Sequence, residues 1–328
     1  MRGVFITIPF LLLIGCGFSN CPKDGDIKAQ PVQISVERLE GELFDKQNAE
    51  QIAGFLNDHR SFSDIFLDAR QYPSDSILAN RIYKLIDNPS IDTLYDEAVS
   101  AYPDMSMIKS DLETAIGKLK TLYPDTKTPK LQTAVTGLYK DLFISDSLII
   151  VGLDFFIGKG ATFTPRDIPQ YVLSRYNEEH LASIIVKFLA GQQVANGKTE
   201  TLLSEMIDFG KTYYLASRML PCTPDSILLG YTPENMKLIY QNEHVIWANL
   251  LENEVLYETS HVIKRKFIGE RPNVYEIDEE CPGRIGAWVG WRIVEQYMEI
   301  NDVSIKQLLA DSDNDKIFRL SGYKPQSH

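Results

Sequence analysis

The feature that most limits what this chain can fold into is a short apolar run at its N-terminus that ends in Cys16. Arg2 supplies a positive start, and the stretch from Ile6 to Ile14 is about as long as the apolar region of a signal peptide. The four residues Leu13-Ile14-Gly15-Cys16 are typical of a lipobox, in which the cysteine becomes the new N-terminus. An ordinary secretory site would need a second small residue three positions before the cut. Residues 1–15 are therefore predicted to be a lipoprotein signal peptide.

Acyl chains such as palmitate on Cys16 are expected to hold the mature protein to a membrane, because two or more chains give stable anchoring. No other stretch approaches the roughly 20 apolar residues of a membrane-spanning helix. Residues 16–32 are broken by glycine and proline and carry several charges, so they are predicted to be a flexible tether. Gly17, rather than an aspartate, follows the anchor. By the rule used for enteric bacteria, this favours the outer membrane, with the domain facing the periplasm.

The composition after the tether is that of a packed globular protein. The hydrophobic fraction is 44% and the aromatic fraction 10%, which is enough for a substantial core. The formal net charge of -12, with no basic cluster, argues against nucleic acid as a partner. No internal repeat and no clear linker divides the sequence, so residues 33–328 are predicted to form a single domain.

The cysteines that follow the anchor are Cys21, Cys222 and Cys281. Three is an odd number, so at most one pair can form within the chain. An exported protein meets oxidising conditions, which allows a Cys222–Cys281 disulfide. Two buried free thiols at these positions are the alternative, and both interpretations stay open. Cys21 lies in the tether and is the one expected to remain unpaired.

The fold is predicted to be α+β and predominantly helical, with a small sheet embedded among many helices. Polar and apolar residues alternate from residue 33 to residue 39, which indicates a half-buried strand. Apolar runs over 131–139 and 147–156 indicate two further strands, the second of them central. Helical spacing of apolar residues predicts helices over 48–57, 76–85, 91–102, 104–123, 177–191, 199–219, 232–241, 245–258, 283–298 and 304–309.

The sequence contains no recognisable catalytic or metal-binding motif. None of its five histidines lies four residues from another, so the HExxH pattern of zinc peptidases is absent. The nearest approach is Glu178-Glu179-His180, where Ile184 occupies the position of the second ligand. Glu254 and Glu258 share a predicted helix face, but solvated carboxylates are common in an acidic protein. There is no GxSxG nucleophile motif either. We therefore predict no catalytic residue, no metal site and no cofactor.

The most unusual segment runs from Pro282 to Val294. Its two glycines, Gly286 and Gly290, are one helical turn apart, so another backbone could approach that face closely. The segment also contains two tryptophans and two arginines: Trp288, Trp291, Arg284 and Arg292. One interpretation is a close-packed core helix whose arginines need acidic partners or solvent. The other is a docking surface for a partner protein, formed by these four residues.

Three segments together carry a resemblance to a known family: Val151-Gly152-Leu153-Asp154-Phe155-Phe156-Ile157-Gly158, Pro165-Arg166-Asp167-Ile168-Pro169-Gln170-Tyr171, and 282–294. With the lipobox, they make the chain similar to the gliding motility-associated lipoprotein GldB family of the Bacteroidota. The resemblance implies an envelope lipoprotein that acts with other gliding components. It also implies a distant likeness to predicted zinc peptidases of zincin-like fold, in a degenerate form here, because the helix at 177–191 lacks the ligand pair.

The favoured hypothesis is a non-catalytic, lipid-anchored protein of the cell envelope. Its expected partners are the membrane, through the lipid, and envelope proteins of the motility or secretion machinery. One alternative is an unrecognised zincin-like metallohydrolase with Glu179 and His180 near a cleft. Another is a carrier for a small apolar or peptidic ligand in a pocket beside the sheet.

Overall fold

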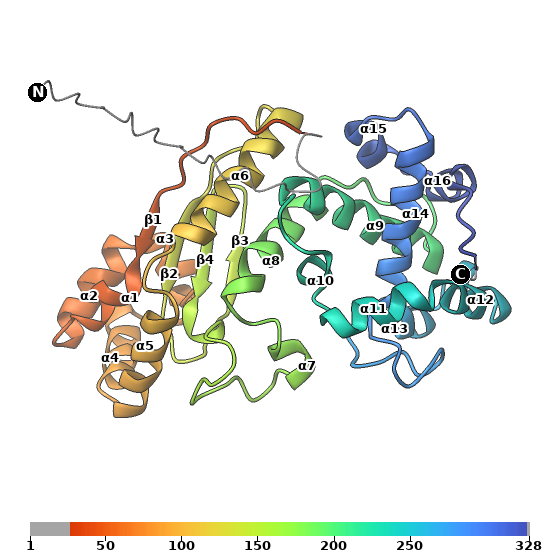
Figure 1. Cartoon of the computed structure of the whole chain (residues 1–328). Helices are drawn as coiled ribbons and strands as arrows, with labels where there is room; N and C mark the ends of the chain where they lie inside the picture. The colour runs from red at the N-terminus through yellow and green to blue at the C-terminus, as the bar shows by residue number, and fades with distance from the viewer. Residues whose placement is uncertain (1–26, 327–328) are drawn as a thin grey trace, which may run out of the picture.

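The computed structural model describes residues 27–326 (Figure 1). The predicted signal peptide, Cys16 and Cys21 lie outside these residues. The sheet and the helices from the first half of the chain occupy one side of the molecule, and the helices from α9 onward occupy the other (Figure 1). Among the described residues, no helix combines the length and the apolar character needed to cross a membrane.

The sheet has four strands in the order β1-β2-β4-β3. Strands β1 (Val36–Arg38), β2 (Lys130–Ala134) and β4 (Leu148–Gly152) are parallel, and β3 (Leu142–Ile144) runs antiparallel to β4 at one edge. The two central strands are buried along most of their length, as expected for strands covered on both faces.

Successive residues of β4 project into two separate hydrophobic cores, because side chains alternate along a strand. Ile150 belongs to a core formed with the first helices of the chain. Ile149 and Val151 belong to a larger core that continues into the C-terminal half. The helices around the sheet are α1 (Leu39–Phe44), α2 (Ala49–Asp58), α3 (Arg60–Ile65), α4 (Asp75–Ile86), α5 (Pro89–Ala101), α6 (Ser106–Leu122) and α8 (Glu178–Gly191).

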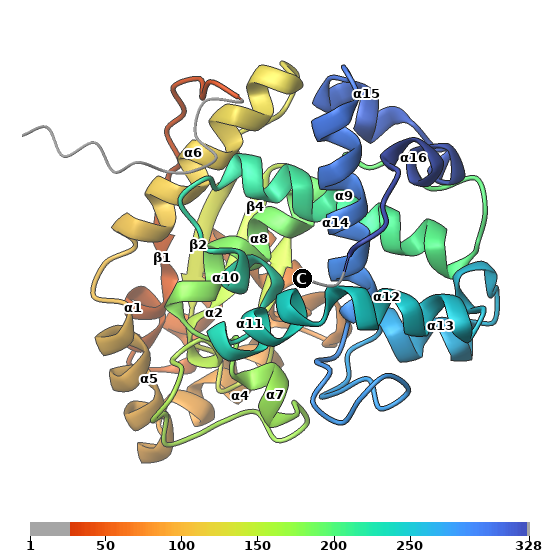
Figure 2. The same cartoon turned by 45° about the vertical axis from the view of Figure 1, so that its right-hand side comes forward.

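The C-terminal half is built around α9 (Leu202–Met219) and α14 (Ile285–Ile300), which lie side by side (Figures 1 and 2). A Cβ atom on Gly290 would overlap the carbonyl oxygen of Met206, and one on Gly210 would overlap that of Gly290. The two backbones are thus in direct contact, which confirms the predicted close approach at Gly290. The remaining helices of the described residues are α7 (Gln170–Leu173), α10 (Asp225–Leu229), α11 (Pro233–Gln241), α12 (Glu243–Glu252), α13 (His261–Ile268), α15 (Ile305–Ala310) and α16 (Asn314–Ser321).

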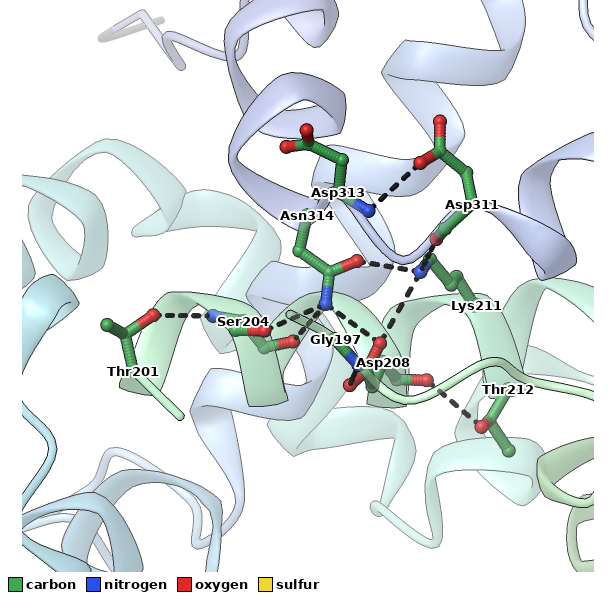
Figure 3. Close-up of polar contacts among 9 residues, drawn as sticks. All are labelled: Gly197, Thr201, Ser204, Asp208, Lys211, Thr212, Asp311, Asp313 and Asn314. Carbon is green, nitrogen blue, oxygen red and sulfur yellow. Dashed lines mark hydrogen bonds and ion pairs between the residues drawn. The ribbon is translucent and has the colours of Figure 1, made fainter. Parts of the chain in front are cut away.

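A buried polar network attaches the last helices to α9 (Figure 3). The ammonium group of Lys211 is fully buried and donates to the carbonyl of Asp311 at 2.7 Å and to the side chain of Asn314 at 2.6 Å. The amide of Asn314 in turn donates to Asp208 at 2.8 Å and to Ser204 at 2.9 Å. Because each buried donor finds a partner, the network holds α15 and α16 in one position on α9.

The predicted fold class is confirmed: the protein is mostly helical with a small mixed sheet. Several boundaries differ. The strand expected over 131–139 ends at Ala134, because Gly137 and Leu138 adopt positive φ angles of 73° and 59°. The strand expected over 147–156 ends at Gly152 and continues as a 3-10 turn, Leu153–Phe155. Strand β3 was not predicted, since three residues are too few to show a period.

Two further expectations are wrong in detail. The helix predicted over 245–258 ends at Glu252, because Glu254 has a φ angle of 54°, so Glu254 and Glu258 do not share a helix face. The last part of the predicted tether is not free. Ile27 is buried, and the backbone N–H of Gln30 donates to the carbonyl of Gly117 at 3.0 Å. The chain is therefore packed against α6 from residue 27 onward.

Candidate functional site

Helix α14 holds the two predicted tryptophans in the core rather than at the surface. Trp288 is 0% exposed and Trp291 is 2% exposed. The ring of Trp288 meets Tyr240 edge-on at 5.6 Å between centroids, and Trp291 stacks on Tyr213 at 5.8 Å. The interpretation of Trp288 and Trp291 as a docking surface is corrected by this burial. The glycine-mediated contact with α9 draws the α14 backbone inward and leaves both indoles inaccessible.

The two arginines of the segment reach two different hollows. Arg284 precedes α14 with a φ angle of 61°, a left-handed conformation that is uncommon for a bulky residue. Its guanidinium donates to the carbonyl of Leu229 at 2.7 Å and lies 5.4 Å from the ring centre of Tyr231. Its Nε is 3.4 Å from a carboxylate oxygen of Glu270. These contacts hold the side chain in place despite the strained backbone.

Glu270 is shared between Arg284 and a second arginine, Arg175, which follows α7. The two terminal nitrogens of Arg175 donate to the two oxygens of Glu270 at 3.1 and 2.8 Å, a fork-shaped pairing. Burial opposes the charge of Glu270, but the hydrogen bonds from Arg175 and the charge of Arg284 outweigh it and lower the pKa of this carboxyl. Glu270 is therefore ionised at neutral pH.

These side chains line a cavity of about 240 Å³ between α7, the end of α10 and the α13–α14 loop. We call it the arginine cavity. Its lining residues are Tyr171, Ser174, Arg175, Gly230, Tyr231, Thr232, Asn235, Glu270, Arg271, Pro272, Pro282, Gly283 and Arg284.

A lysine from α8 lies behind the wall of the arginine cavity. The Nζ of Lys187 donates to the carbonyl of Leu228 at 2.7 Å and lies 5.8 Å from the ring centre of Tyr213. Burial, together with the neighbouring charges of Arg284 and Arg175, lowers the pKa of Lys187 to about 7. Lys187 and Arg284 both bind the free carbonyls at the end of α10, where the helix dipole favours cations.

Arg292 lies two turns further along α14 and points toward another hollow. Its Nε is 3.0 Å from Glu243, and a terminal nitrogen is 2.6 Å from Glu295. The hydroxyl of Tyr323 also donates to Glu243, at 2.8 Å. The groove beside it has a volume of about 800 Å³ and is lined by residues of α6, α9, α14 and α15, with Ile27. Its charged lining residues are Arg218, Arg292, Glu295, Glu299 and Lys306.

His180, proposed as a catalytic or metal-binding residue in the hydrolase alternative, lies at the start of α8. It is buried, and its Nδ1 is 2.8 Å from the side-chain oxygen of Asn177, the N-cap of the helix. Burial, and then the charges of Lys187 and Arg175, lower the pKa of His180 to about 4, so its ring is neutral at pH 7. Glu179 is exposed. Within residues 27–326, no group of three His, Cys, Asp or Glu side chains has an arrangement that could hold a metal ion.

Neither of the two interpretations of Cys222 and Cys281 holds in full. Cys281 is a buried free thiol, while Cys222 takes part in a disulfide. The Cys222–Cys281 bridge is therefore not formed. Burial raises the pKa of Cys281, which keeps its thiol protonated and unreactive.

One buried carboxyl lies in a segment that carries the family resemblance. Asp154 accepts hydrogen bonds from the backbone N–H groups of Thr136 at 3.1 Å and Leu138 at 2.6 Å. Burial raises the pKa of Asp154 to about 6, although these backbone hydrogen bonds act in the opposite direction. Asp154 thus fixes the sharp turn that follows β2.

Sequence reasoning identified Arg284 and Arg292 but missed Arg175, Lys187 and Glu270. Arg175 comes four residues after the end of the resembling segment 165–171, which was the sequence signal nearest to it. Lys187 is the one charged residue between His180 and the end of the apolar helix at Gly191. A single cation on an otherwise apolar helix is a sequence signal that can mark a functional position.

The fold and these contacts define an α+β protein in which a small mixed sheet supports a large helical half. A family model described as gliding motility protein GldB matches residues 20–325. The chain therefore belongs to this family of gliding motility-associated lipoproteins, and the resemblance seen in the sequence is confirmed over nearly the whole chain. Comparisons with curated proteins and with solved structures gave no match. The zincin-like part of the resemblance stays a prediction.

Proposed function

We propose that this protein is a non-catalytic, lipid-anchored component of the cell envelope that works with the gliding motility machinery by binding other envelope proteins. The observation that carries the proposal is the family match over residues 20–325, combined with the lipobox ending at Cys16. A lipid anchor places a folded domain next to a membrane, where components of the motility or secretion machinery are its neighbours.

The contacts of the described polar residues support a binding role over a catalytic one. His180 caps α8 through Asn177, and Asp154 holds a turn. The ammonium group of Lys211 donates its hydrogen bonds within the network that attaches the C-terminal helices to α9. In this proposal, residues 33–328 act as one domain on the periplasmic face of the outer membrane, and Arg284 and Arg292 contribute through the hollows that they line.

The experiment is affinity purification from native envelopes after mild crosslinking, with the intact protein compared with Cys16→Ala. We expect the intact form to recover motility or secretion components reproducibly and the variant to lose them. Recovery of the protein alone in both cases would contradict the proposal. An Arg265→Gln variant, which changes an exposed residue of α13, serves as a control that should recover the same components.

A carrier function is the second candidate, and one observation favours it. A mostly apolar hollow of about 400 Å³ lies beside the sheet, where β2 ends and the turn around Gly137 begins. Its walls include Leu43, Leu78 and Ile82. Ligands of open α/β sheets commonly bind at the carboxyl ends of parallel strands. Native mass spectrometry of the purified protein would reveal a bound species, and a mass equal to that of the polypeptide with its lipid would speak against it.

A further inference from the structure

The charges around the arginine cavity do not balance. Three arginines and one glutamate line it, in a chain that has 45 acidic and 33 basic residues. Arg271 pairs outside the cavity, at 2.9 Å from Glu276. The guanidinium groups of Arg175 and Arg284 therefore share Glu270 as their carboxylate partner.

The cations are fixed and desolvated, whereas the anion is at the rim. The side chains of Arg175 and Arg284 are each 13% exposed, but that of Glu270 is 49% exposed. Arg284 is held by Leu229 and by the ring of Tyr231 whether or not Glu270 is present. Glu270 can consequently move into solvent without disturbing the contacts of Arg284, and this would leave the two N–H groups of Arg175 available to another carboxylate. A pairing with desolvated guanidinium groups is stronger than one at the surface.

The geometry already accommodates a carboxylate. Arg175 offers two parallel N–H groups to the two oxygens of Glu270, the arrangement that suits a planar carboxylate. Thr232, the N-cap of α11, and Asn235, in its first turn, also line the cavity, so the positive end of that helix faces the same space. The remaining walls include Tyr171 and Pro282, which offer apolar surface to whatever is attached to the carboxylate.

We propose that the arginine cavity is a binding site for a carboxylate-bearing ligand, and that Glu270 is a built-in competitor occupying the carboxylate position in the free protein. The ligand's carboxylate would pair with Arg175 and Arg284 after Glu270 swings outward. A volume of about 240 Å³ suits a group the size of an amino-acid residue. Such a carboxylate comes either from a small organic acid or from the C-terminus of a peptide. This inference goes beyond the proposed function and does not depend on it.

The test is isothermal titration calorimetry, in which each probe is added to the full-length, detergent-solubilised protein and the heat of binding is measured. The probes are succinate, an N-acetylated alanine tripeptide with a free C-terminus, the same tripeptide as its C-terminal amide, and inorganic phosphate. We expect at least one of the two carboxylate probes to bind saturably at millimolar concentration or below. Glu270→Gln, which removes the competing charge but keeps the shape, should bind it about tenfold more tightly. Whichever of succinate and the tripeptide binds more tightly shows whether the natural carboxylate belongs to a small organic acid or to a peptide C-terminus.

Three variants complete the design. Arg175→Lys keeps the charge but loses the fork, so it should bind more weakly, and Arg284→Gln should abolish binding. Arg265→Gln, on the exposed side of α13, should bind as the wild type does. Thermal melts check that each variant is folded, and Glu270→Gln provides a gain of function that misfolding cannot mimic. The proposal is overturned if neither carboxylate binds Glu270→Gln, if the amide binds equally well, or if phosphate binds more tightly than both.

Discussion

Gly290 of α14 lies directly against the carbonyl of Met206 in α9, with no room for a side chain between the two backbones. Gly210 of α9 meets the backbone of Gly290 in the same way. A glycine in a helix interior costs roughly 1 kcal/mol of helix stability relative to alanine. The packing between the two backbones must therefore stabilise the fold by more than these glycines destabilise their helices. The close crossing is the reason both tryptophans of α14 are buried.

The first prediction concerns this crossing. Gly290→Ala should lower the free energy of unfolding by about 3 kcal/mol, because the added methyl group forces α9 and α14 apart. Gly54→Ala is the matched control, since Gly54 lies in the exposed part of α2 and a Cβ there would meet nothing within 4 Å. That control should be neutral or slightly stabilising. Chemical denaturation measures both, and equal effects would show that the backbones are not in contact.

The second prediction concerns the buried network of Figure 3. Lys211→Met should destabilise the protein by about 3 kcal/mol, because it leaves Asn314 and the carbonyl of Asp311 without their donor. Lys198→Met removes an exposed ion pair with Asp313 and should change stability by less than about 0.5 kcal/mol. The comparison uses denaturant unfolding at pH 7. A Lys211 variant as stable as the Lys198 variant would argue against the network.

The third prediction concerns Asp154 and acid pH. Its pKa is 3.8 in an unfolded chain and about 6 in the folded protein. The folded state therefore binds the proton more tightly, and this contribution to stability is present below pH 3.8 and lost as the pH rises through 6. Asp154→Asn does not titrate, so its stability relative to wild type should increase by about 3 kcal/mol over that window.

Unfolding of the wild type and Asp154→Asn at a series of pH values between these limits measures the effect. The exposed Asp125→Asn is the control for the substitution itself and should follow the wild-type curve. A constant difference between wild type and Asp154→Asn across the window would mean that folding does not raise the pKa of Asp154, contrary to its burial.

The fourth prediction concerns Lys187 and alkaline pH. Its pKa falls from 10.5 to about 7 on folding, so above pH 7 the unfolded state binds more protons than the folded state. Stability attributable to this residue therefore rises with pH and is lowest below pH 7. Lys187→Met should lack this rise, and the difference between the two proteins should change by about 2 kcal/mol between pH 7 and pH 9. Parallel curves would refute the assignment.

Local sequence determined most of the secondary structure of this protein. Asn177, Thr201 and Thr232 cap the helices that follow them, and each side chain accepts a hydrogen bond from the first helical turn. The pair Gly286 and Gly290 correctly predicted a close backbone approach. These features act within one or two helical turns, so they can be recognised without knowledge of the partner segments.

The tertiary structure alone decided which of these residues meet and which face solvent. Arg175 and Glu270 are 95 residues apart in the sequence, and Lys211 and Asn314 are 103 apart. Helical periodicity showed that the α14 segment is apolar nearly all round, but it could not show that both indoles point inward while Arg284 and Arg292 reach separate hollows. The physical reason is that a helix face acquires its environment only when distant segments pack on it, and the energy of that packing is not encoded in local propensity.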